Sequence, residues 1–423
     1  MEIIVERGCG TDVHKKSLTA WVLLGKPGSK PKKFSRTFDT TTPGLLEFRD
    51  WLLEHQVTHV AMESTGVYWK PVYAILEGTF TVIIGNAKHM RNVPGRKTDV
   101  KDAEWIADLL RHGLIKASFV PPKDIRQLRE LVRYRTKLTQ SRTAERNRLL
   151  KLLEDANIKL SNVASDVFGK SGREMVAALI EGTETPAQMA EHAHGRLRDK
   201  IPELTRALDG RMEEHHRHIL RLQLRRMSEL DRDISEIDAE VDRRLEPFRL
   251  DRERLDGIPG VDWVLGAVLI AELGLNMAVF PSAKHASAWT GIAPGSFQSA
   301  GKNLHHGARK GNVHLRTALV QAANAAFHTK DTFLGEKFRR LRARRGHKRA
   351  AMAIGHKILT AAYTILKTKC EYRDLGANYI DVAAKTNVTA RLARRLTKLG
   401  YMVIPPAEPP KLPPRTTPNF HSS

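Results

Sequence analysis

KTDVKDAEWIADLL, residues 97–110, places the carboxylates of Asp99 and Asp102 three residues apart at the start of a segment with helical apolar spacing. Residues at positions i and i+3 of a helix lie on one face, about one turn apart. Carboxylates held in this way can bind divalent metal ions together with carboxylates from elsewhere in the fold. The same acids also suit an ordinary first helical turn with Thr98 as its N-cap. This segment alone therefore predicts a helix and leaves a metal site open.

The residues before this helix have the pattern of an α/β sheet. Strands are predicted at 2–5, 18–24, 33–38, 58–63 and 80–84, and helices at 42–56 and 67–76. This order predicts a mixed sheet with helices on its faces. Asp12 falls in the first strand region and Glu63 at the end of the fourth strand. Because ligands at the strand ends of such a sheet face a common crevice, we expect the two acids to converge with Asp99 and Asp102.

The composition predicts a folded protein with a polyanionic partner. Its 423 residues suit several domains, and 70 Lys and Arg against 47 Asp and Glu give a net charge of +23. Nucleic acid is the usual partner of so basic a chain. No apolar run approaches the roughly 18 residues of a membrane-spanning helix, so a membrane is not expected as a partner. Two cysteines predict a reducing, cytoplasmic location and no disulfide framework.

Three motifs together resemble a known family. GTDVHK at 10–15, MESTGVYW at 62–69 and the opening segment resemble the RuvC-like, ribonuclease-H-fold domain of the DEDD transposases of bacterial insertion sequences, recombinases associated with a bridge RNA. The resemblance implies an α/β catalytic domain at 1–122. It also implies a site for Mg²⁺ or Mn²⁺ whose catalytic and metal-binding residues are Asp12, Glu63, Asp99 and Asp102. The alternative is that these acids are separate helix caps and surface residues.

Residues 123–250 predict a helical, coiled-coil linker. A seam with alternating spacings of three and four residues comprises Leu220, Met227, Leu230, Ile234, Ile237 and Val241. Contacts between protomers, RNA binding and a passive spacer are all open functions for this linker. The histidines at 192, 194, 215, 216 and 218 lack a recognised zinc-ligand spacing, so solvated or RNA-facing side chains are expected there.

Residues 251–335 predict a mainly α-helical C-terminal domain. LDGIPGVDWVLGAVLIAEL at 255–273 resembles a helix-hairpin-helix, whose turn can hold a phosphate through backbone N–H groups; an ordinary Gly-Pro turn is the alternative. The segment 280–323 resembles the C-terminal transposase domain of the same family. The positions that match are Trp289, Gly291, Ile292, Pro294, Ser299, Lys302, Lys310, Gly311, Asn312, Leu315 and Arg316.

The resemblance makes Ser299 the candidate nucleophile. A serine hydroxyl that attacks a DNA phosphodiester forms a phosphoserine, and this bond allows strands to be rejoined without ATP. Ala300 separates Ser299 from Gly301, whereas the family has Ser-Gly directly, so Ser296 stays an alternative. A loop-forming serine without chemistry is the other alternative. The candidate nucleic-acid-binding residues are Lys302, Arg309, Lys310, Asn312 and Arg316.

The remainder, 336–423, predicts a basic helical tail and a disordered Pro-rich end. Taken together, the sequence predicts a transposase that cuts and rejoins DNA, works with a structured guide RNA and forms a homo-oligomer, either a dimer or a tetramer. A metal-dependent endonuclease of the Holliday-junction-resolvase kind, with Ser299 as a bystander, is one alternative. A non-catalytic nucleic-acid-binding scaffold is the other.

Overall fold

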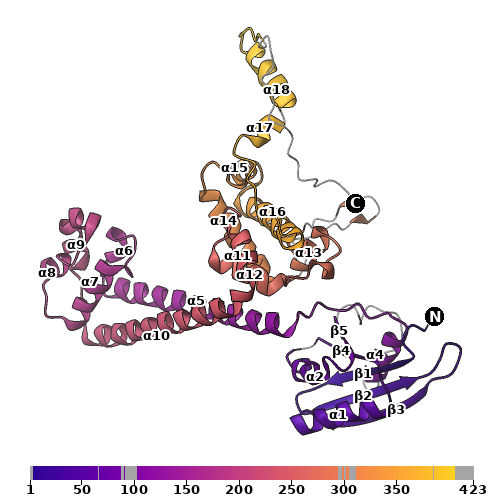
Figure 1. Cartoon of the computed structure of the whole chain (residues 1–423). Helices are drawn as coiled ribbons and strands as arrows, with labels where there is room; N and C mark the ends of the chain where they lie inside the picture. Colours follow the sequence, from indigo (N-terminus) through magenta and orange to yellow (C-terminus); the bar gives the residue numbers. More distant parts are fainter. Residues whose placement is uncertain are drawn as a thin grey trace. The chain divides into compact units, whose positions relative to one another are not determined.

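A computed structural model describes residues 3–64, 66–86, 90, 102–293, 298–299, 302–303, 311–383 and 385–404. The chain forms two compact units, Met1–Pro121 and Pro122–Ser423. Figure 1 labels the helices and strands of both units along the chain. None of the described helices combines the length and the apolarity needed to cross a membrane.

The first unit contains a mixed five-stranded sheet with the order β3-β2-β1-β4-β5. Strand β1 pairs antiparallel with β2 and parallel with β4, β4 pairs parallel with β5, and β2 pairs antiparallel with β3. The strands are β1 (Arg7–Val13), β2 (Ser17–Leu24), β3 (Lys32–Asp39), β4 (His59–Glu63) and β5 (Thr81–Gly85), and the helices are α1 (Thr42–Glu54), α2 (Trp69–Leu76) and α4 (Asp102–Arg111). The predicted α/β class is therefore confirmed.

The position predicted for the first strand is wrong. The strand is the glycine-containing segment RGCGTDV, not residues 2–5. Ile4 and Val5 instead donate backbone hydrogen bonds to the carbonyl of Arg111, at the end of α4. Small residues are placed in this central strand because a helix lies directly on it.

Alternation along the strands separates two apolar cores. Val60 and Met62 of β4 face a core that includes Phe48 of α1 and Leu76 of α2. Ala61, which lies between them, faces the other core with Leu109 and its neighbours on α4. Successive strand residues point to opposite faces of a sheet, so α1 and α2 cover one face and α4 covers the other.

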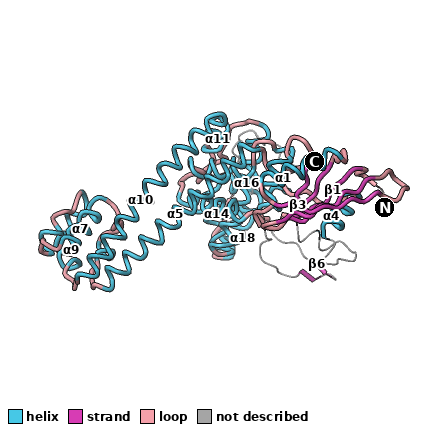
Figure 2. Tube along the Cα trace, turned by 90° about the horizontal axis from the view of Figure 1, so that it is seen from below, coloured by secondary structure: helices cyan, strands magenta, loops and turns pink. Residues whose placement is uncertain are grey.

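The second unit begins with a long antiparallel helical hairpin. Helix α5 (Lys123–Asp155) and helix α10 (Glu214–Leu245) run side by side, as Figures 1 and 2 show. Arg135 pairs with Asp238, and Arg142 pairs with Asp231 at 3.0 Å. The later residue of α5 pairs with the earlier residue of α10, so the two helices are antiparallel. Most residues of the predicted seam are buried on α10, and the coiled-coil assignment stays a prediction.

Short helices close the far end of this hairpin. They share one core with the ends of α5 and α10, which includes Leu149, Met175, Leu179, Leu204 and Leu220. The elements are α6 (Leu160–Val163), α7 (Lys170–Glu181), α8 (Pro186–Ala190), η2 (Gly195–Lys200) and α9 (Ile201–Leu208).

A helical body follows the hairpin. Its central helices are α14 (Val313–His328) and α16 (His347–Thr368), which pack closely because Gly355 lies against Leu319. The other elements are η3 (Glu246–Phe248), α11 (Arg249–Asp256), α12 (Trp263–Leu273), η4 (Met277–Val279), α13 (Ala283–Thr290), β6 (Gln298–Ser299), β7 (Lys302–Asn303) and α15 (Phe333–Arg345).

The turn that resembles a helix-hairpin-helix packs against α14. Gly260 has φ of +87°, and a Cβ atom there would lie 2.2 Å from the carbonyl oxygen of Ala322. The carboxylate of Asp262 accepts a hydrogen bond of 2.9 Å from the backbone N–H of Leu265 and caps α12. A carboxylate thus already occupies this helix N-terminus, and phosphate binding by the turn stays a prediction.

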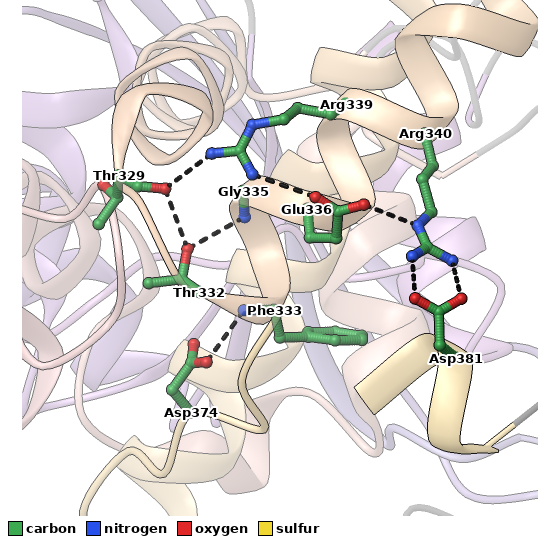
Figure 3. Close-up of polar contacts among 9 residues, drawn as sticks. All are labelled: Thr329, Thr332, Phe333, Gly335, Glu336, Arg339, Arg340, Asp374 and Asp381. Carbon is green, nitrogen blue, oxygen red and sulfur yellow. Dashed lines mark hydrogen bonds and ion pairs between the residues drawn. The ribbon is translucent and has the colours of Figure 1, made fainter. Parts of the chain in front are cut away.

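Ion pairs attach the C-terminal segment to α15 (Figure 3). The guanidinium of Arg340 donates to Glu336 in its own helix and to both carboxylate oxygens of Asp381 in α17 (Tyr379–Ala383). Asp374 accepts a hydrogen bond of 2.9 Å from the backbone N–H of Phe333 at the start of α15. Helix α18 (Lys385–Lys398) follows, and the Pro-rich end lies outside the described residues.

Candidate functional site

Helix α4 lies in direct contact with the backbone of β1. A Cβ atom on Gly10 would lie 2.1 Å from the backbone nitrogen of Ala107 and 2.3 Å from the carbonyl oxygen of Ala103. Two residues earlier, a Cβ atom on Gly8 would lie 3.1 Å from the side chain of Leu110. The helix therefore runs antiparallel to β1, and its first residues lie toward the end of β1 that carries Asp12.

Two of the four predicted metal ligands, Asp12 and Glu63, lie on the face of the sheet that α4 covers. Gly8, Gly10 and Asp12 alternate along β1, so the Asp12 side chain points to the face that α4 covers. Glu63 follows Ala61 by two residues on β4 and points to the same face. The pairing of Thr11 with Met62 brings these two strand ends side by side.

Asp102, the last of the four predicted ligands along the chain, is the first residue of α4. Asp99 lies outside the described residues, as does most of the stretch from 87 to 101. Asp12 is about one-third exposed, with its Oδ2 3.0 Å from Nε2 of His14, and Glu63 and Asp102 are half-buried. Carboxylate oxygens are the ligands that Mg²⁺ and Mn²⁺ prefer, so these donors fit either ion.

Within the part of the chain that the structure describes, another group has ligand atoms closer together. Atoms of Asp155, His215 and His216 all lie within 4.8 Å of one another, whereas Asp12, Glu63 and Asp102 do not form such a group. Nδ1 of His216 accepts a hydrogen bond of 3.2 Å from the backbone N–H of Glu213, so Nε2 carries the proton and donates to Asp155 at 3.2 Å.

Both ring nitrogens of His216 thus have partners, Nδ1 in the cap of α10 and Nε2 on Asp155 of α5, and a metal ion would have to displace the Nε2 proton while Nδ1 still accepts. The side chain of His216 is 7% exposed, so the expectation of a solvated histidine is wrong at this position. Its burial follows from the helix cap, which closes the end of the α5–α10 hairpin. We assign this group to structure.

The described residues on either side of the serine segment, residues 294–310, lie in contact with each other. A Cβ atom on Gly311 would lie 2.4 Å from the backbone nitrogen of Gly291, and the backbone N–H of Asn312 donates to the carbonyl of Trp289 at 3.1 Å. Ser299 and Lys302 belong to the short strands β6 and β7, which pair antiparallel. The side chains of these two residues, and all of Arg309 and Lys310, lie outside the described residues.

Comparison with known families identifies the chain. Residues 9–158 match a family model of DEDD type described as transposase, and residues 252–338 match one described as transposase IS116/IS110/IS902 family. The chain belongs to the DEDD transposases of insertion sequences. It is therefore a DNA transposase, and its first matched region contains the sheet that carries Asp12 and Glu63.

Two curated relatives share low identity with this transposase over much of its length. It is 25% identical over 287 residues to the transposase for insertion sequence element IS1111A of Coxiella burnetii, which covers 66% of this chain and 70% of that protein. It is 24% identical over 337 residues to a probable family 20 transposase of Pseudomonas aeruginosa, covering 77% of this chain and 89% of that protein.

A buried carboxylate of this transposase that sequence reasoning missed contacts Asn312, which lies two residues after the serine segment. Glu272 is 1% exposed near the end of α12 and receives two hydrogen bonds from Arg133 of α5, at 2.7 and 2.8 Å. The Asn312 amide donates a third, at 2.6 Å. Arg129 donates to the last-turn carbonyls of Ala271 and Glu272, both at 2.9 Å. We call Glu272, Arg129, Arg133 and Asn312 the Glu272 node.

Contacts within the Glu272 node and burial determine the pKa values of its charged groups. Burial alone would raise the pKa of Glu272, but hydrogen bonds from Arg133 and the charges of both arginines outweigh it and hold the pKa below its usual range. Burial lowers the pKa of Arg129 to about 10, so the guanidinium stays charged at neutral pH. The sequence signal for the node is a lone glutamate near the end of an otherwise apolar helix.

The described nucleic-acid candidates differ in their surroundings. Both polar atoms of the Asn312 side chain have contacts inside the protein, because its Oδ1 also accepts a hydrogen bond of 3.2 Å from the backbone N–H of Leu315 and caps α14. Arg316, one turn later on α14, is half-buried. Contact of either residue with nucleic acid stays a prediction.

Proposed function

We propose that this transposase cuts and rejoins DNA with a divalent-metal site built on Asp12, Glu63, Asp99 and Asp102 and with Ser299 as its nucleophile. The observation that carries the proposal is the shared face of the sheet, where Asp12 and Glu63 end adjacent strands beneath the first turn of α4. Separate caps and surface acids would have no reason to share this face.

The carboxylates would hold Mg²⁺ or Mn²⁺ against the scissile phosphate. When bound, such ions polarise the phosphate and stabilise the charge on the leaving oxygen. Asp12 is anchored on a central strand and Asp102 on the helix that lies against it, so both ligands are on rigid elements. His14, beside Asp12 at 3.0 Å, would help to orient that carboxylate.

Ser299 would exchange one phosphodiester for another. Its Oγ forms a bond to phosphorus while the bond from phosphorus to one strand's oxygen breaks, and that oxygen leaves with a proton. In the second step the hydroxyl of the incoming strand attacks the phosphoserine and releases the serine. Because each step replaces one phosphoester bond with another, no ATP is needed.

We also propose that a structured RNA guides the reaction and that the protein works as a dimer or tetramer in the cytoplasm. The net charge of +23 suits an RNA partner read through phosphate and 2′-hydroxyl contacts. Arg344 and Arg345 near the end of α15 are exposed, whereas Arg135 and Arg142 on α5 are engaged in ion pairs with α10. Two Arg-rich stretches, 126–148 and 339–349, are candidate RNA-binding surfaces. We expect the one at 339–349 to contribute more, because its arginines are more exposed.

The carboxylate proposal is tested with Asp12→Asn and Asp102→Asn in the full-length protein. Each change should abolish Mg²⁺- or Mn²⁺-dependent strand cleavage while duplex affinity changes less than about twofold, because binding rests on Lys and Arg contacts with phosphates. Asp108→Asn is the matched control, since Asp108 lies on the same helix beside His112 and outside the proposed site. Cleavage at the wild-type rate by a double Asp12→Asn, Asp102→Asn variant would exclude the site.

The RNA proposal has its own test. Purified protein is treated with RNase, re-purified, and assayed for recombination with and without RNA transcribed from the flank of the element. Guidance predicts that recombination is lost on treatment and returns with the added RNA. Equal recombination by treated and untreated protein would exclude a guide.

A further inference from the structure

The Glu272 node connects the base of the serine segment to α5. Asn312 lies two residues after the segment. Its Nδ2 donates to Glu272 at 2.6 Å, and its Oδ1 accepts from the α14 backbone at 3.2 Å. Its backbone N–H holds Trp289, on the other side of the segment, at 3.1 Å. Both ends of the segment are therefore held by one residue, and that residue is held by Glu272.

On its other side, the node is held by the first turns of α5. Arg129 and Arg133 lie one turn apart on this helix. It begins at Lys123, two residues after the first unit ends at Pro121. The guanidinium of Arg133 donates one hydrogen bond to each carboxylate oxygen of Glu272. This two-point contact fixes the direction of the carboxylate as well as its distance. Arg129 simultaneously closes the carbonyl end of α12.

Stability alone does not explain so polar a node. Buried ion pairs contribute little net stability compared with apolar side chains of similar volume, because removing charges from water offsets their attraction. What such a node supplies is a single geometry, since each donor must meet its own acceptor. A well-defined geometry matters most beside a nucleophile that has to approach phosphorus in line.

We propose that Asn312 and Glu272 are positioning residues for strand exchange, which hold the base of the serine segment at a fixed place on α5. This inference rests on the proposed attack by Ser299. This role requires no contact of either residue with DNA, because both act through the segment that carries the serine. Misplacement of a reacting group by about 1 Å can lower a rate by about 100-fold, so loss of the node should affect chemistry far more than binding.

An exchange of the two functional groups tests the proposal in the full-length protein. Asn312→Asp keeps the cap of α14 but sets a second carboxylate against Glu272, where the present contact is 2.6 Å. Glu272→Gln alone removes the charge that pairs with Arg133. Together, Asn312→Asp and Glu272→Gln restore one donor and one acceptor between these two positions, with the same total charge and with the hydrogen bond reversed. Arg133 then keeps one of its two contacts with residue 272, the one to Oε1.

The rate of serine–DNA adduct formation is measured on a nicked suicide duplex with Mg²⁺, alongside duplex affinity and thermal unfolding. Asn312→Asp should slow adduct formation at least about tenfold, with affinity within about twofold of the wild type because the phosphate contacts are unchanged. The double variant should recover part of the lost rate, because the contact between positions 312 and 272 is restored while one Arg133 contact is lost. Asn276→Asp, the same change at the exposed cap of η4, is the matched control and should have no effect.

The outcomes separate the inference from the proposed function. A wild-type rate for Asn312→Asp, or a double variant no faster than Asn312→Asp alone, would overturn the positioning role while leaving Ser299 as the nucleophile. Wild-type protein that forms no serine adduct would overturn the proposed function and this inference with it. If Asn312→Asp does not fold, Asn312→Ser keeps the cap and removes only the donor to Glu272. A several-fold loss of rate then supports the role, and a wild-type rate excludes it.

Discussion

Replacing Gly10 with alanine should push the helix that carries Asp102 away from the sheet. The added Cβ would lie 2.1 Å from the backbone nitrogen of Ala107, which is 1.3 Å short of the 3.4 Å at which ordinary contact begins. The contact with the Ala103 carbonyl, at 2.3 Å, is almost as close. Both neighbours are backbone atoms, so no side-chain rotation can relieve the clash and α4 itself must move.

A displacement of this size has two measurable effects. Overpacking of a well-packed core costs about 1–3 kcal/mol, so the Gly10→Ala protein should unfold at a lower temperature and exchange α4 amide hydrogens faster. Metal-dependent strand cleavage should fall by about 100-fold, because Asp102 moves with α4 relative to Asp12 and Glu63.

Gly8→Ala is the matched control on the same strand and the same face. Its Cβ would meet side-chain atoms of Leu110 at 3.1 Å and Val5 at 3.3 Å, which can yield by a few tenths of an ångström. This variant should cleave DNA within about threefold of the wild type. Wild-type cleavage by Gly10→Ala, or an equal loss in Gly8→Ala, would refute the reasoning about α4.

Three further changes test other parts of the molecule. Arg129→Met should lower the free energy of unfolding by about 1–3 kcal/mol, measured in urea, because it removes the donor to two buried carbonyls of α12. Tyr363→Phe should cost about 1 kcal/mol, since its buried hydroxyl donates to the Phe280 carbonyl at 2.8 Å. Burial first, and then the charge of Arg133, lowers the pKa of His314 below 6.5. Because protonation of His314 is less favourable in the folded protein than in the unfolded chain, its contribution to the free energy of unfolding should be complete above pH 6.5 and should be lost as the pH falls. In thermal scans, the unfolding temperature of His314→Gln should therefore fall less steeply with pH than that of the wild type.

The sheet could be predicted because its signals are local. Alternating apolar residues, a Pro-containing helix start at Thr42 and the spacing of apolar residues after Asp102 each define an element within a few residues. The strand with Gly10 was misplaced because its glycines, read locally, indicate a turn. Only the packing of α4, more than 90 residues later, explains why small residues lie in a central strand.

The Glu272 node could not be found from local pattern. Glu272 and Arg133 are 139 residues apart, and Asn312 lies 40 residues beyond the glutamate. The family resemblance of the Lys310-Gly311-Asn312 segment makes Asn312 a candidate for contact with nucleic acid, whereas both polar atoms of its side chain have partners inside the protein. Long-range polar contacts of this kind depend on the tertiary arrangement of α5, α12 and α14, which no single stretch of sequence encodes.

Mass spectrometry of the wild-type protein stalled on suicide DNA tests the central proposal most directly. Trypsin releases residues 285–302 as one peptide, HASAWTGIAPGSFQSAGK, which contains both Ser296 and Ser299. Attack by the proposed nucleophile predicts a phosphoserine with attached nucleotide at Ser299, formed only with Mg²⁺ or Mn²⁺ and absent from Asp12→Asn and from Ser299→Ala. Cleaved DNA with free phosphate ends and no adduct would contradict the account and indicate a resolvase-like nuclease, and an adduct at Ser296 would contradict the choice of serine.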